Sequence, residues 1–188
     1  MGERRQTYTV EVAGLKRELP LFEVAPGVKI AIVNILGDNE LVQAAARALA
    51  AQIADRHPEA IVTAETKSIP LAYAMSIEMH LSYVVLRKAY KPYMGNAISA
   101  ETLSITTGAP QMLYLDEKDQ SLLKGHRVAL VDDVISTGST LQGMRIIMEK
   151  VGAQVVVQAA IFTEGDRAKW TDVIALGHLP VFVESPDP

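Results

Sequence analysis

The residues of this chain best suited to chemistry lie in one stretch, VALVDDVISTGST, at positions 128–140. The apolar residues 128–131 predict a buried strand that delivers two adjacent carboxylates, Asp132 and Asp133, to the edge of a sheet. Small or hydroxylated residues come next and lead into a predicted helix: Ser136, Thr137, Gly138, Ser139 and Thr140. Such a loop presents backbone N–H groups and hydroxyls at the positive end of a helix, and this favours phosphate binding.

The two carboxylates indicate a second kind of ligand next to the phosphate. Because like charges repel, the acids suit sugar hydroxyls, which donate hydrogen bonds to a carboxylate, or a hydrated divalent cation. A phosphate and a diol this close together describe a ribose 5-phosphate. The stretch is neither a Walker phosphate loop nor a dinucleotide-binding fingerprint, since it lacks both the Gly-Lys-Ser/Thr and the Gly-x-Gly-x-x-Gly patterns.

Basic residues occur in predicted loops at the same edge of the sheet: Lys67, Arg87, Lys88 and Lys91. The first follows a predicted strand at 60–64, and the others follow a predicted strand at 83–86. Ligands of parallel α/β sheets bind at the carboxyl ends of the strands, so we expect these cations beside the phosphate loop. Lys and Arg there would stabilise negative charge on a bound ligand.

The stretch 128–140 resembles the 5-phosphoribosyl 1-diphosphate (PRPP) signature of type I phosphoribosyltransferases at every position. The wider resemblance, to the adenine and xanthine branch of that family, covers roughly residues 20–165. It implies a parallel twisted sheet with helices on both faces, a small hood, a flexible loop and a homodimer. It also implies Mg²⁺, carried by the diphosphate rather than by direct side-chain ligands, with Asp132 and Asp133 reaching it through water.

The resemblance assigns roles to residues around the sugar phosphate. Asp132 and Asp133 match the acids that hold the ribose 2′- and 3′-hydroxyls, and residues 136–140 match the loop that binds the 5′-phosphate. Residues 63–68, TAETKS, fall where this branch binds diphosphate, which implies that Glu65, Lys67 and Ser68 contact PRPP.

The resemblance also implies three catalytic cations. Arg87 and Lys88 look like the basic pair at the start of the flexible loop, and Lys91 resembles a loop lysine of the adenine enzymes. We expect the loop, residues 88–101, to close over the site and exclude water.

The chain departs from the family at positions that act on the base. Thr106 stands where the adenine enzymes carry a glutamate proposed to transfer a proton, and Ser136 stands where a second branch carries an aspartate. Ile30 replaces an aromatic residue that stacks on the base. Thr106 and Ile30 lie outside the predicted ribose-phosphate site, and Ser136 stays within the match to the PRPP signature, whereas the identity of the base stays open.

The elements that must position these residues alternate along the chain. Apolar runs predict strands at 28–35, 60–64, 83–86, 103–107, 111–115, 127–131, 155–162 and 173–176, with the fourth and fifth forming a hairpin. Helical spacing and caps predict helices at about 40–56, from the cap Ser68 through Met79, and at 140–151. This order predicts an α/β fold with a parallel sheet, in one domain of residues 1–188 whose first 25 residues form an added hood.

Composition narrows the function classes. The 188 residues carry a formal net charge of −4 and no cysteine, which argues against nucleic-acid binding and excludes disulfides, cysteine-ligated metals and thiol catalysis. No apolar run is long enough for a membrane span, so we expect a cytoplasmic protein. The four histidines do not pair at metal-ligand spacing, and Trp170 is expected to pack.

Two functions fit these observations. The first is a pentosyltransferase that transfers 5-phosphoribose from PRPP to a nucleobase, a purine with adenine favoured, giving a nucleoside 5′-monophosphate and diphosphate in salvage. The alternative is a regulatory protein that binds PRPP or a nucleotide without turnover. Thr106 favours the alternative, whereas the cations on the diphosphate side and the lack of a helix-turn-helix segment favour the enzyme.

Overall fold

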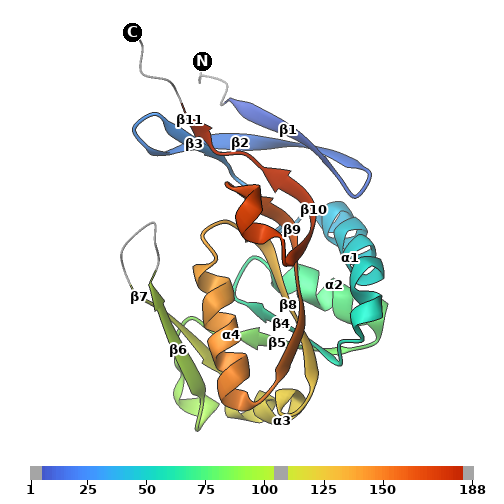
Figure 1. Cartoon of the computed structure of the whole chain (residues 1–188), viewed down its shortest axis with the longest axis vertical. Helices are drawn as coiled ribbons and strands as arrows, with labels where there is room; N and C mark the ends of the chain where they lie inside the picture. Colours follow the sequence, from blue (N-terminus) through green and yellow to red (C-terminus); the bar gives the residue numbers. More distant parts are fainter. Residues whose placement is uncertain (1–5, 104–109, 184–188) are drawn as a thin grey trace.

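The computed structural model describes residues 6–103 and 110–183. Its centre is a five-stranded sheet in the order β10-β9-β8-β4-β5, and every pair of neighbouring strands is parallel (Figure 1). The strands are β4 (Ala60–Ala64), β5 (Ser82–Leu86), β8 (Arg127–Ile135), β9 (Gln154–Glu164) and β10 (Val173–Leu179). The predicted α/β fold is confirmed, and all five carboxyl ends lie at one edge.

Helices cover both faces of this sheet (Figure 1). Helices α1 (Asn39–Ile53) and α2 (Ile69–Met79) pack together on one face, and α4 (Ser139–Val151) packs on the other. Capping residues in the sequence explain where two of these helices begin and end. Asp38 accepts a hydrogen bond from the Leu41 N–H (3.1 Å) at the start of α1, and Gly152, at φ 77°, ends α4. No helix in the described residues is both long and apolar enough to cross a membrane.

A four-stranded antiparallel sheet forms the hood, in the order β1-β2-β3-β11. Its strands are β1 (Thr7–Val12), β2 (Leu15–Ala25), β3 (Val28–Ala31) and β11 (Phe182–Val183). The strand predicted at 28–35 is therefore shorter and belongs to the hood, because the chain reverses at Gly27 (φ 70°) and β3 pairs back on β2. Arg17 fixes the hood to α1 by ion pairs with Asp38 (2.7 Å) and Glu40 (2.8 Å).

A hairpin of β6 (Ile98–Leu103) and β7 (Pro110–Leu115) packs against α4. The predicted start of the strand at 103–107 is wrong, since the strand begins at Ile98. The rest of that prediction falls on residues 104–109, which lie outside the described residues. The predicted loop 88–101 is correspondingly shorter, because β6 begins at Ile98. The other elements are short: η1 (Ala54–Arg56), η2 (Pro92–Met94), η3 (Glu117–Asp119), α3 (Gln120–Leu123) and η4 (Arg167–Trp170).

Candidate active site

Strand β8 carries the predicted acid pair within the sheet and not after it. The prediction that the strand ends at 131 is wrong, because Asp132 pairs in register with Ala160 of β9 and the strand continues to Ile135. Asp133 is 8% exposed. The sheet therefore fixes both acids on a rigid element at the edge where ligands of this fold class bind.

Ser68 joins the loop after β4 to the acid pair. Its hydroxyl lies 2.5 Å from Asp132 Oδ1 and 3.2 Å from Asp133 Oδ1, and it accepts a hydrogen bond from the Asp133 N–H (3.1 Å). Ser68 stands at the N-cap position of α2, but its side chain makes no hydrogen bond to the helix backbone. The expected capping interaction is therefore replaced by a link between the loop after β4 and the acid pair of β8.

The environment of Asp132 changes its protonation. Burial and the neighbouring Asp133 carboxylate raise the pKa of Asp132 to about 7, and the hydrogen bond from Ser68 opposes the rise only in part. Without a ligand, the two acids therefore carry less than two full negative charges near neutral pH. Sugar hydroxyls or a hydrated cation would favour the fully ionised pair, so the donor set fits either ligand.

The loop between β8 and α4 forms a pocket of about 40 Å³ lined by Asp132 and residues 134–141. Gly138 has φ 78° and stands at the start of α4, while the Thr137 and Ser139 hydroxyls lie 3.1 Å apart. A Cβ at Gly138 would lie 2.8 Å from Cη2 of Trp170, whose ring covers the loop. Both the backbone angle and the space therefore require glycine, and Trp170 packs as expected.

The loops after β4 and β5 are joined by Glu65. Its carboxylate accepts hydrogen bonds from Arg87 Nε (2.6 Å) and the Lys88 N–H (2.5 Å), and the peptide bond between Glu65 and Thr66 is cis. Burial acts to raise the pKa of Glu65, but the bonds from Lys88 and Arg87 outweigh it and lower that pKa. Glu65 therefore stays ionised and holds Arg87 beside the 65–68 loop.

The remaining predicted cations are more open. Lys67 Nζ lies 3.3 Å from the Val33 carbonyl, and Lys88 and Lys91 are exposed. Among the described residues, the hydrogen bonds and ion pairs connect Lys91 neither to the acid pair nor to Glu65. Thr106 lies outside the described residues, and Ile30 pairs with Phe22 across the hood sheet.

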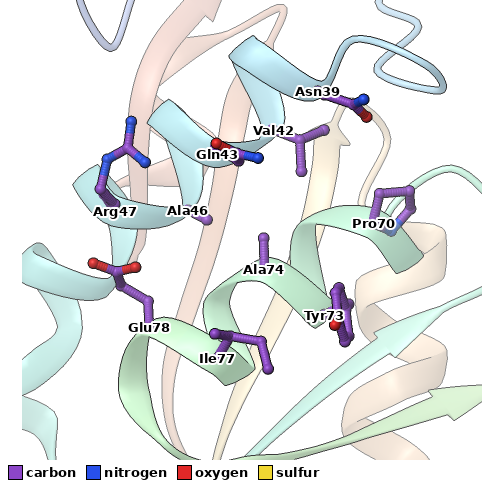
Figure 2. A pocket seen from close by; sticks show the side chains of 10 residues that line it. All are labelled: Asn39, Val42, Gln43, Ala46, Arg47, Pro70, Tyr73, Ala74, Ile77 and Glu78. Atoms are coloured by element: carbon purple, nitrogen blue, oxygen red, sulfur yellow. The ribbon is translucent and has the colours of Figure 1, made fainter.

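Two further observations bear on ligands. Within residues 6–103 and 110–183, no three His, Asp or Glu side chains gather in a way that could hold a metal ion. A larger hollow, of about 410 Å³, lies between α1 and α2 and contains no predicted site residue (Figure 2).

Sequence reasoning missed one residue at this edge, Glu164. It is the last residue of β9 and is 9% exposed, and burial raises its pKa. The available signal is a single acidic residue directly after the apolar run AAIFT, at the carboxyl end of a predicted strand. Its burial depends on η4 and β10, which no local pattern reveals.

Comparisons with known proteins agree with this geometry. The chain is 28% identical over 132 residues to the purine biosynthesis transcriptional repressor PurR of Bacillus subtilis (70% of this chain, 46% of the relative). It is 37% identical over 112 residues to a hypoxanthine/guanine phosphoribosyltransferase of Methanococcus voltae (60% and 56%). It is 33% identical over 154 residues to an adenine phosphoribosyltransferase of Sphingopyxis alaskensis (81% and 79%). The chain thus spans about half the length of the first two relatives.

The fold is also found among solved structures. Adenine phosphoribosyltransferase from Trypanosoma brucei, in complex with AMP, pyrophosphate and ribose 5-phosphate, superposes with a TM-score of 0.66 at 21% identity, covering 92% of this chain and 76% of that one. The sequence pattern of the phosphoribosyl transferase domain matches residues 33–176, from the end of the hood to β10. Because this match covers more than half of its length, the chain belongs to the phosphoribosyl transferase domain family.

Proposed function

We propose that this chain is a PRPP-dependent pentosyltransferase that transfers 5-phosphoribose to a purine and releases diphosphate, in purine salvage. One observation carries the proposal: Ser68 bonds the acid pair of β8, so the diphosphate loop and the ribose-phosphate site form one hydrogen-bonded unit. A ligand that contacts both loops must carry a sugar phosphate and a second anionic group. PRPP has that shape.

The reaction follows from the positions of these groups. A ring nitrogen of the base bonds to C1′ of the ribose, and the bond from C1′ to the diphosphate oxygen breaks with its electron pair going to the diphosphate. Lys67, Arg87, Lys88 and Lys91 would stabilise the charge on that leaving group, while Asp132 and Asp133 orient the ribose. The proton of the base nitrogen leaves to solvent or to a nearby carboxylate.

Mg²⁺ fits the donor set as a substrate-bound ion. When bound, it would supply positive charge to the leaving diphosphate. Asp132 and Asp133 would hold its water ligands, and Ser68 would keep the first of these carboxylates in place.

Adenine is the favoured acceptor in this proposal. Support comes from the adenine enzyme of Sphingopyxis alaskensis, which aligns with 81% of this chain. The hypoxanthine/guanine relative, at 37% identity over a shorter region, supports 6-oxopurines as the competing class. Turnover with a panel of bases decides between them.

A second candidate function is a PRPP-binding regulator without turnover. The similarity to the repressor PurR over 70% of this chain supports it. The two candidates differ in one respect only. Both bind PRPP through Asp133, whereas the enzyme alone consumes it.

The face formed by α1 and α2 supports a homodimer. Large apolar side chains are exposed on α2, where Tyr73 is 54% and Ile77 58% exposed, and on the strand β5, where Tyr83 is 37% exposed. Figure 2 shows the first two beside the hollow between the helices. A patch of this kind is typical of a protein interface, so we expect Tyr73→Glu to convert a dimer to a monomer in light scattering.

The enzyme proposal is tested by incubating the protein with PRPP, Mg²⁺ and adenine, hypoxanthine, guanine or xanthine, and measuring diphosphate release. We expect turnover with at least one purine and loss of PRPP binding in Asp133→Asn. Asp55→Asn, an exposed change in η1, is the matched control and should behave as the parent chain. PRPP binding without turnover for any base would favour the regulator, and no PRPP binding would refute both.

A further inference from the structure

The side chain of Trp170 lies behind the loop between β8 and α4. Trp170 ends η4, the short orange-red turn that lies beside the start of α4 in Figure 1. A Cβ at Gly138 would lie 2.8 Å from Cη2 and 3.2 Å from Cζ3 of the indole, so the ring is close against the backbone there. The pocket of this loop is lined by Asp132 and residues 134–141, and Trp170 does not line it. The indole therefore lies on the side of the loop opposite the pocket.

A loop that binds phosphate needs support of this kind. Its backbone N–H groups must stay free for the anion, so they cannot also hold the loop in shape. Among the described residues, the side-chain hydrogen bonds within this loop join only Thr137 and Ser139, at 3.1 Å between the hydroxyls and 3.4 Å from the Ser139 N–H. Gly138 has no side chain with which to cap α4. Packing against the indole is therefore the side-chain contact that fixes the backbone at Gly138.

The chain holds Trp170 on both sides. Its indole N–H donates a hydrogen bond to the carbonyl of Glu164, the last residue of β9 (3.0 Å). Two residues after Trp170, Asp172 forms an ion pair with Arg145 of α4 (2.8 Å) and accepts a hydrogen bond from Gln158 of β9 (3.0 Å). The ring also packs against the apolar cluster between α4 and the sheet. The indole is therefore a fixed wall rather than a mobile surface side chain.

We propose that Trp170 is a positioning residue for the 5′-phosphate, because its indole holds Gly138 in the left-handed conformation that directs the N–H groups of residues 136–140 toward the ligand. This inference rests on the proposed function, which places the 5′-phosphate on this loop. The phosphate takes no part in bond breaking at C1′, so it is bound equally in the ground state and the transition state. Loss of the indole should therefore raise KM for PRPP and leave kcat nearly unchanged.

The proposed role also defines which ligands respond. Ribose 5-phosphate carries the 5′-phosphate, so it should bind more weakly without the indole. In the proposed function, diphosphate binds to the loops after β4 and β5, which lie on the other side of β8 from β9. Diphosphate should therefore bind as in the parent chain, whereas a general disturbance of the site would weaken both ligands.

The test compares Trp170→Phe with the parent chain, by kinetics with PRPP and by calorimetry of ribose 5-phosphate and diphosphate. The phenylalanine ring is too short to support Gly138. We therefore expect KM for PRPP and Kd for ribose 5-phosphate to rise about 10-fold, with kcat and Kd for diphosphate within about 3-fold of the parent.

Phe162→Leu is the matched control, because it shortens a buried aromatic ring that packs beside another glycine. A Cβ at Gly177 would lie 2.7 Å from Cε1 of Phe162. This variant should lower Tm and change none of the four constants by more than about 3-fold.

Three outcomes decide the inference. Parent-like KM and Kd values in a folded Trp170→Phe would overturn it and leave the proposed function intact. Equal weakening of ribose 5-phosphate and diphosphate would also overturn it. If the parent chain binds neither PRPP nor ribose 5-phosphate, the proposed function fails together with the inference. Where no base turns over, Kd for PRPP replaces KM.

Stability provides a readout that needs no ligand. In the Trp170→Phe background, a Cβ at residue 138 no longer meets the indole, so Gly138→Ala should lower Tm about half as much as it does in the parent chain. Equal drops in the two backgrounds would overturn the inference. Should Trp170→Phe fail to fold in a thermal melt, Trp170→Tyr replaces it in every measurement, with the same pattern expected at about 3-fold or more.

Discussion

Gly138 offers a direct test of how the phosphate loop is built. Replacement by alanine combines two costs, the strain of a Cβ at φ 78° and a contact of 2.8 Å with Cη2 of Trp170. The left-handed backbone costs about 1–2 kcal/mol and the overlap about 1–3 kcal/mol. We therefore expect Gly138→Ala to lower the free energy of unfolding by about 2–5 kcal/mol, or Tm by roughly 4–20 °C.

Gly125 is the matched control, because it has φ 79° but no atom lies within 4 Å of the position that a Cβ would take there. Gly125→Ala should show the backbone cost alone, so the difference between the two variants measures the contact with Trp170. Urea unfolding gives both energies. PRPP calorimetry should show about 10-fold weaker binding for Gly138→Ala only, since in the proposed function the 5′-phosphate binds to the loop of Gly138 and not to that of Gly125. Equal destabilisation of the two variants, with equal PRPP affinity, would refute this description of the loop.

Three other perturbations have defined outcomes. The raised pKa of Asp132 means that the folded chain binds more protons than the unfolded chain between about pH 4 and 7, so the stability of the fold falls as pH rises through that window. Asp132→Asn should therefore be about 1–3 kcal/mol more stable than the parent at pH 8 and no more stable near pH 4, as measured by urea unfolding. Glu65→Gln removes the ion pair that holds Arg87, and kcat/KM for PRPP should fall about 10-fold while Tm changes by less than about 3 °C; an unchanged kcat/KM would contradict that positioning role. Lys91→Ala should slow turnover about 10- to 100-fold and weaken AMP binding less than about 3-fold, whereas equal losses would exclude a role at the leaving group.

Local sequence patterns predicted the features that depend on neighbouring residues. The apolar run before Asp132, the hydroxyl-rich loop and Gly138 specify a strand, a turn and a helix start in succession, and the structure has them in that order. The parallel sheet followed from the alternation of strands and helices. Such features are encoded within a dozen residues, which is why a single sequence reveals them.

Features that depend on pairing between distant segments were missed. β8 extends through Asp132 because β9 offers a partner as far as Thr163, and β3 joins the hood because β2 is available to it. β6 begins at Ile98 because alternate side chains, including the buried Ala100, meet α4 and the rest of that face. In each case the partner strand or helix decides the boundary.

The candidate site divides in the same way. The place of the acid pair and of the hydroxyl-rich loop at the carboxyl edge of the sheet could be predicted from residue types and spacing, and the expected diphosphate loop, residues 63–68, came from the resemblance. Three features could not be predicted in this way: the hydrogen bond from Ser68 to Asp132, the ion pair of Glu65 with Arg87, and the burial of Glu164. Each depends on segments that are distant in the sequence and meet only in the fold. These links are the ones that set charge states and hold the loops together.

The central claim is that a ribose 5-phosphate group binds where β8 meets the 136–140 loop. A crystal structure of the protein with AMP tests it most directly. We predict the 5′-phosphate on the backbone N–H groups and hydroxyls of 136–140, with the ribose hydroxyls on Asp132 and Asp133. Nucleotide bound elsewhere while that loop stays empty would contradict the account.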